Sequence, residues 1–80
     1  MEYEELQSRL RKEIPGTSIG FQNGTPVVVS YSTKLSELRS ATKNIDPNYE
    51  GGFAYAPGRA LFLNPRMTWL DNLESKTEAA

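Results

Sequence analysis

The stretch TSIGFQNGTPVVVSY, Thr17 to Tyr31, decides the fold class of this chain. Two runs rich in β-branched and aromatic residues flank Asn23-Gly24, the dipeptide that most strongly favours a two-residue β-turn. The stretch therefore predicts a β-hairpin with strands over 17–22 and 25–31. The register that a type I′ turn fixes pairs Gln22 with Thr25, Phe21 with Pro26 and Ile19 with Val28.

This hairpin carries apolar side chains on both faces, because successive side chains of a strand point to opposite sides. We expect Ile19, Phe21 and Val28 on one face. The other face should hold Val27, Val29 and Tyr31. One layer of helices covers only one face of a sheet, so the second face needs either helices of its own or contact with another chain.

Apolar residues at helical spacing flank the hairpin on both sides. Before it, residues 2–13 predict a helix that Pro15-Gly16 ends, with an ion pair between Glu5 and Arg9. After it, Ser32 or Thr33 can cap a second helix that ends before Asp46-Pro47. The inward-facing stripes are expected to be Tyr3, Leu6, Leu10 and Ile14 in the first helix, and Leu35, Leu38, Thr42 and Ile45 in the second.

The C-terminal part predicts a second hairpin and a third helix. Residues 52–56 and 59–63 read as strands joined across Pro57-Gly58, which suits a type II turn. Thr68 with Asp71 resembles a capping box that opens a short helix holding Trp69, Leu70 and Leu73. We expect residues 1–73 to form one domain and 74–80 a flexible tail.

A weak internal repeat at an offset of 32 residues supports two helix-plus-hairpin units, arising either by duplication or from shared turn chemistry. The identical pairs are Glu5/Glu37, Leu6/Leu38, Ser8/Ser40, Pro15/Pro47, Gly20/Gly52 and Phe21/Phe53. The expected fold is α+β, with element order αββαββα: a four-stranded, mainly antiparallel sheet with helices packed on it.

Composition argues against several classes of function. The chain of 80 residues has neither histidine nor cysteine, so it lacks imidazole and thiolate ligands, disulfides and the usual proton-transfer group near neutral pH. We therefore expect no catalytic residues, no metal and no cofactor. Nine basic and ten acidic residues give a net charge of −1, which argues against nucleic acid or an anionic membrane as the main partner.

Two sets of residues are candidates for binding. The set expected at a protein interface combines the second face of the strand over 25–31 with the third helix, and comprises Val27, Val29, Tyr31, Trp69, Leu70 and Leu73. The alternative set interleaves aromatic rings with cations, as single-strand nucleic-acid binders do, and comprises Tyr49, Phe53, Tyr55, Arg59 and Arg66. Phe53 and Tyr55 are better explained as core residues facing the helices, because so small a domain needs its large side chains in the core.

The sequence leads us to expect a non-enzymatic interaction protein, such as an adaptor, an inhibitor or an assembly subunit. Its partner would be another protein or a second copy of itself, since so small a domain gains stability by association. The alternatives are a single-stranded nucleic-acid binder and a small-metabolite-binding protein at a subunit interface. The acidic N-terminus has no signal-peptide pattern and no apolar run is long enough to cross a bilayer, so we expect a cytoplasmic location.

Overall fold

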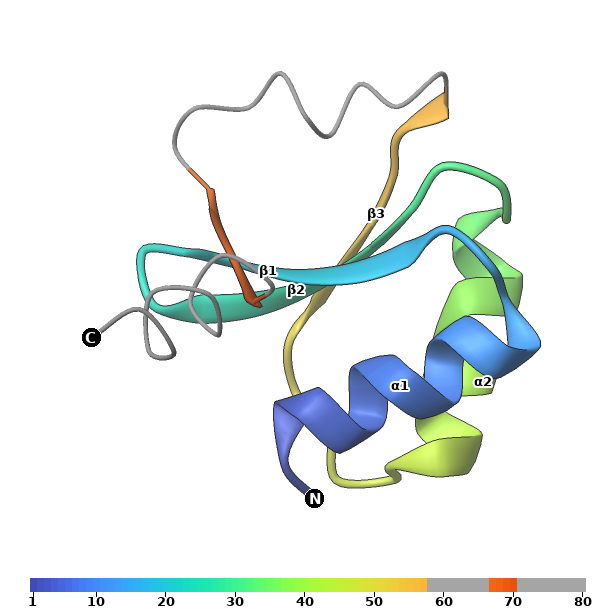
Figure 1. Cartoon of the computed structure of the whole chain (residues 1–80), viewed down its shortest axis with the longest axis horizontal. Coiled ribbons are helices and arrows are strands. Elements are labelled where there is room, and N and C mark those ends of the chain that lie inside the picture. Colours follow the sequence, from blue (N-terminus) through green and yellow to red (C-terminus); the bar gives the residue numbers. More distant parts are fainter. Residues whose placement is uncertain (58–66, 71–80) are drawn as a thin grey trace.

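The computed structural model describes residues 1–57 and 67–70, and these residues form two helices and a four-stranded mixed sheet (Figure 1). The strand order is β3-β2-β1-β4. The expected α+β class is confirmed. The elements in chain order are α1 (Tyr3–Glu13), β1 (Thr17–Gln22), β2 (Thr25–Ser30), α2 (Leu35–Ile45), β3 (Gly52–Tyr55) and β4 (Thr68–Trp69).

The central hairpin forms as its sequence predicts. β1 and β2 pair antiparallel, and the partners include Gln22 with Thr25 and Ile19 with Val28. Asn23 and Gly24 have φ angles of 54° and 82°, the two left-handed residues that a type I′ turn requires. The expected register is therefore confirmed.

β3 corrects the expected topology, because it lies parallel to β2 and Val28 pairs with Phe53. The segment β2-α2-β3 is thus a crossover through a helix, the kind of connection that parallel neighbours need. β1 is antiparallel to both β2 and β4, so the sheet is mixed. The expected strand over 59–63 lies outside the described residues.

The expected helix opening at Thr68 is also wrong at its start, since Thr68 and Trp69 form strand β4. They pair antiparallel with Phe21 and Gly20 of β1. Threonine and tryptophan are both common in strands. The β1 edge also supplies backbone hydrogen-bond partners, and a capping motif read from the local sequence contains no information about that edge. The rest of that helix, including Leu73, and the tail over 74–80 lie outside the described residues.

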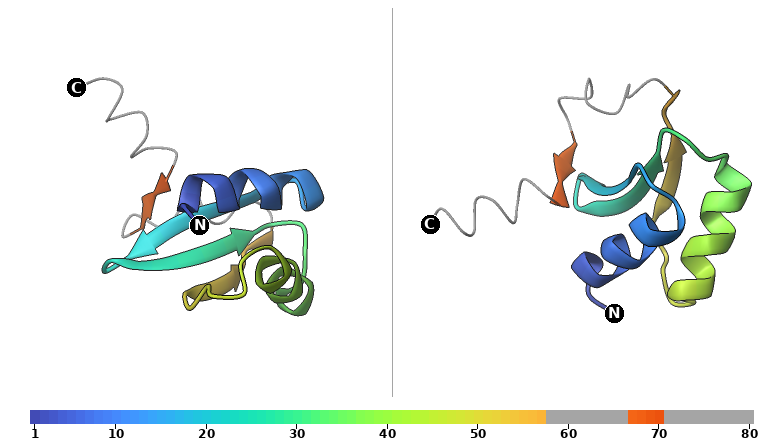
Figure 2. Two further views of the ribbon diagram at one scale, coloured as in Figure 1. Left: turned by 90° about the horizontal axis from the view of Figure 1, so that it is seen from below. Right: turned by 45° about the vertical axis from the view of Figure 1, so that its right-hand side comes forward.

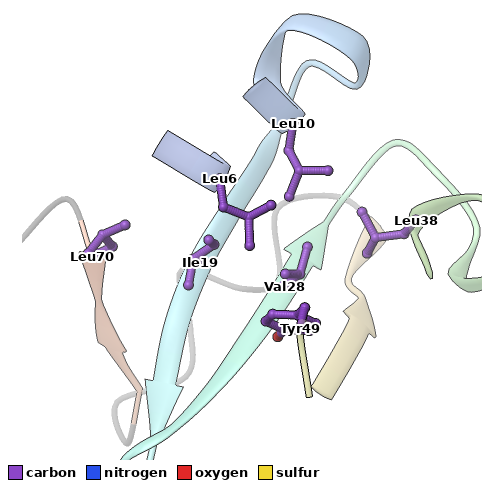
Figure 3. Close-up of a cluster of buried hydrophobic side chains, with 7 residues drawn as sticks. All are labelled: Leu6, Leu10, Ile19, Val28, Leu38, Tyr49 and Leu70. Carbon is purple, nitrogen blue, oxygen red and sulfur yellow. The ribbon is translucent and has the colours of Figure 1, made fainter. Parts of the chain in front are cut away.

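Both helices pack on the same face of the sheet, and the core lies between them and the two central strands (Figures 2 and 3). Ile19 and Val28 are fully buried in this core, and Phe21 packs against it, as the alternation predicts. α1 also carries the expected ion pair, with Arg9 Nη2 3.5 Å from Glu5 Oε2. The buried cluster comprises Leu6, Leu10, Ile19, Val28, Leu38, Tyr49 and Leu70.

α2 begins later than its sequence predicts, and this changes which side chains face inward. Lys34 occupies the N-cap position, so neither Ser32 nor Thr33 is the cap. Ser30 Oγ instead accepts the backbone N–H groups of Ser32 and Thr33, both at 3.2 Å. Leu35, expected in the inward stripe, is 45% exposed, because it stands in the first turn at the end of the layer.

Candidate functional site

The outer edge of β1 is largely covered by α1. β4 pairs with β1 only at Gly20 and Phe21. Further along the strand, the Ile19 N–H donates to Gln7 Oε1 at 2.8 Å, and Arg11 Nε donates to the Thr17 carbonyl at 2.7 Å. Side chains of α1 therefore satisfy backbone groups that β4 does not reach.

The outer edge of β3 is different. The Ala56 N–H donates to the Ser30 carbonyl at 2.9 Å, so the backbone groups of Ala56 point toward β2. Adjacent residues of a strand direct their N–H and C=O groups to opposite edges, which places those of Phe53 and Tyr55 on the outer edge. Among the described residues, neither a strand nor a side chain bonds to these four groups.

Exposed apolar side chains stand beside this open edge. Tyr55 is 47% exposed and, like Phe53, projects toward the helix layer. The Arg39 guanidinium lies over the Phe53 ring, 5.6 Å from its centroid. α2 runs antiparallel to β3 (Figure 2). The step from Arg39 back one helical turn to Leu35 therefore runs in the same direction as the step from Phe53 to Tyr55. Leu35 is therefore expected beside Tyr55.

Tyr49 anchors the start of this edge strand. Its hydroxyl lies 2.8 Å from the Gly52 carbonyl and 3.2 Å from the Pro26 carbonyl, and its ring makes an edge-to-face contact with Phe53 at 5.3 Å. The side chain is 3% exposed, and this burial raises the pKa of Tyr49 to about 12. The loop leading into β3 is thus held by one buried tyrosine.

We define the docking edge as the outer edge of β3 with its flank on α2: Leu35, Arg39, Phe53 and Tyr55. The sequence patterns identified Phe53 and Tyr55 as binding candidates, but in a nucleic-acid context. They missed Leu35 and Arg39. The helical spacing of apolar residues places Leu35 in the buried stripe, and nothing in the sequence of α2 indicates that Arg39 contacts the Phe53 ring of β3.

Four of the residues expected at a protein interface lie on the sheet face opposite the helices. The register sets Val27 and Trp69 on either side of Gly20, and Val29 and Tyr31 follow Val27 on that side. Val29 and Leu70 are 2% and 7% exposed, so they belong to the interior of the monomer. Val27, Tyr31 and Trp69 are half-buried. The Tyr31 ring lies against Gly16 and the Trp69 ring against Gly20.

Of the aromatic and basic set, the structure describes Tyr49, Phe53 and Tyr55. Tyr49 is buried and Phe53 is packed against the core, which leaves Tyr55 as the exposed ring among the three. Arg59 and Arg66 lie outside the described residues. The described members of this set therefore do not form an exposed stacking platform.

A half-open cavity of 420 Å³ lies between the start of α1, the hairpin turn and the loop before β3. Within the described part of the chain, no cluster of acidic side chains is arranged to hold a metal ion. Every buried side-chain nitrogen and oxygen of the described residues has a hydrogen-bond partner. The cavity is lined by Met1, Tyr3, Thr25, Pro26, Asp46, Asn48, Tyr49, Glu50 and Gly51.

No helix of the described residues has the length and apolar character needed to cross a membrane. No protein-family model, no curated protein and no solved structure gives a significant match to this chain.

Proposed function

We propose that this protein is a small, non-enzymatic protein-interaction module that binds its partner along the docking edge. The observation that carries the proposal is the row of outward-facing N–H and C=O groups on Phe53 and Tyr55, next to the exposed Tyr55 side chain. The exposed side chain of Leu35 is expected beside Tyr55. An open edge of this kind can accept an added strand, whose main-chain hydrogen bonds give affinity while side-chain contacts give specificity. An adaptor, an inhibitor or an assembly subunit would use such an edge.

The chemistry of the chain supports binding over catalysis. A sequence without histidine and cysteine would have to move protons with carboxylates, lysines or tyrosines. Tyr49 has its pKa shifted away from neutrality by burial, and its hydroxyl is engaged by two carbonyl groups. This tyrosine acts as a structural residue.

The substitution Tyr55→Pro tests the docking edge without removing a bond of the sheet. The N–H of residue 55 faces outward, so proline deletes a donor that β2 does not use, and edge strands tolerate proline at such positions. Tyr55→Thr is the matched control, because it removes the ring but keeps the outward donor. Circular dichroism and thermal unfolding should show that both variants fold.

The measurement is affinity purification of tagged protein from the cells that make it, followed by the intact mass of the complex. We expect a second protein at fixed stoichiometry with the wild type, less of it with Tyr55→Thr and none with Tyr55→Pro. A complex that survives Tyr55→Pro unchanged would show that the edge is not the docking site. Multiple turnovers of a substrate by the pure protein would contradict the non-enzymatic proposal.

A further inference from the structure

The flank of the docking edge is positively charged. Arg39 and Lys43 are exposed and lie one turn apart on the side of α2 that faces β3: Arg39 is over Phe53, and Lys43 Nζ donates to the Tyr49 carbonyl. Glu37 is two residues from Arg39, which places it on nearly the opposite side of the helix. A strand that adds to β3 would therefore approach Arg39 before any carboxylate of α2.

Within residues 1–57 and 67–70, the acidic groups near β3 lie at its beginning. Asp46 follows α2 and accepts the Asn48 N–H through Oδ1 at 3.1 Å, and Glu50 precedes the strand. Both are therefore next to Lys43 and away from Tyr55. Among the residues that the structure describes, Arg39 is the cation placed at the middle of the docking edge.

The same charges oppose self-association through this edge. A two-fold axis that pairs β3 antiparallel with a second copy would bring the two α2 helices side by side in opposite directions. When the axis passes beside Phe53, this arrangement sets Arg39 against the partner's Arg39. Like charges facing one another across an interface disfavour it. A second copy of this chain paired in that register is therefore a poor occupant of the edge.

We infer that the docking edge binds an extended acidic segment of a partner protein. This inference rests on the proposed function and specifies its partner. In an added strand, alternate side chains project toward the helix layer. The one beside Phe53 meets Arg39 and is acidic, and the one beside Tyr55 meets Leu35 and is apolar. The recognition pattern is an acidic and an apolar residue separated by one position, in an order that depends on strand direction.

Capped hexapeptides with Glu and Val separated by one residue, in both orders on a threonine background, are suitable probes. Binding to the full chain is followed through the amide resonances of Phe53 and Tyr55. We expect one of the two orders to shift these resonances saturably. Replacing its Glu by Lys should weaken binding about fivefold at low salt, in line with the modest strength of partly exposed ion pairs. Added salt should reduce this difference.

Variants of α2 make the test specific. Arg39→Glu should reverse the preference, so that the Lys peptide binds more tightly than the Glu peptide. Glu37→Arg, on the far side of the same helix, should leave the preference as it is in the wild type. Tyr55→Pro has no amide at residue 55, so its binding is followed at Phe53, and every peptide should leave the Phe53 resonance unshifted.

Several outcomes would overturn the inference while separating it from the proposed function. Equal binding of the Glu and Lys peptides at Phe53 and Tyr55 would remove the acidic preference but keep the edge as a docking site. A concentration-dependent dimer that perturbs the same amides would make a second copy the occupant. If no peptide shifts these amides and the chain stays monomeric, the inference fails. The purification with Tyr55→Pro still tests the proposed function, because it does not depend on the charge of a peptide.

Discussion

Gly51 is required by the packing of a single side chain. A Cβ atom at this position would collide with the Tyr49 hydroxyl and with the backbone carbonyl oxygen of Pro26, which cannot move aside as a flexible side chain could. At Gly52, a Cβ would lie 3.8 Å from Val27 Cγ2, an ordinary contact. Two adjacent glycines therefore have different tolerances for the same change.

We predict that Gly51→Ala lowers the free energy of unfolding by about 1 to 3 kcal/mol, because the Tyr49 hydroxyl must leave its two carbonyl partners. Gly52→Ala should change it by less than about 0.5 kcal/mol. Urea denaturation of the two variants beside the wild type measures both effects. Equal losses would mean that the Tyr49 contact does not restrict this loop.

Tyr49 should make stability depend on alkaline pH. Burial raises its pKa from 10.0 in the unfolded chain to about 12 in the folded one. Between these values the folded state binds more protons than the unfolded state, so stability falls as pH rises. The contribution is complete below pH 10 and is lost as pH approaches 12. Tyr49→Phe should remove this part of the decline, measured by urea denaturation from pH 8 to 12, and an unchanged slope would contradict the assignment.

α1 covers a sheet edge through Gln7, and this is testable by removing the acceptor. Gln7→Met keeps the length and helix propensity of the side chain but leaves the Ile19 N–H buried without a partner. An unpaired buried donor costs about 1 to 3 kcal/mol. The same change at the exposed Gln22 should alter stability by less than about 0.5 kcal/mol. Similar stabilities of the two variants would show that Gln7 does not cover the edge.

The geometry of β3 predicts an alternating pattern of amide hydrogen exchange. The N–H groups of Phe53 and Tyr55 point away from β2 and should exchange quickly. Those of Ala54 and Ala56 point toward β2 and should be protected, with Ala56 held by the Ser30 carbonyl. Exchange followed by NMR on the monomer resolves the four residues. Equal protection would mean that another part of the chain already occupies this edge.

The elements that the sequence predicts correctly are those specified by local chemistry. The hairpin follows from Asn23-Gly24, and the two helices follow from apolar spacing and from the prolines at 15 and 47. β3 and β4 depend on which distant strand accepts their backbone, and that choice involves the whole sheet. A local motif such as the Thr68 capping box therefore gave the wrong element.

At the scale of the whole molecule, the candidate site was harder to predict than the fold. The valines of β2 suggested a docking face, yet Val29 is 2% exposed within the monomer. The docking edge combines Tyr55 of β3 with Leu35 of α2, 20 positions apart in the sequence. It exists because the crossover sets α2 antiparallel to β3, a relation that residue patterns within either element do not contain.

The last prediction separates the stability of the molecule from binding at its edge by means of two leucines on α2. Leu38 is fully buried in the core, and Leu38→Ala should cost about 2 to 5 kcal/mol. A chain of this size has a total stability of only about 4 to 12 kcal/mol, so this variant should be largely destabilised. Leu35 is 45% exposed, and Leu35→Ala should cost less than about 1 kcal/mol.

Binding at the docking edge should respond differently to these two changes. Leu35→Ala should weaken binding of the acidic probe while the protein stays almost fully folded, because it removes a contact from the docking edge. Leu38→Ala should weaken binding only in proportion to the unfolded fraction, so stabilising the fold with an osmolyte should restore it. Titrations with and without the osmolyte distinguish the two. If the osmolyte restored binding to Leu35→Ala as well, Leu35 would act through stability, and the edge would have no direct apolar contact there.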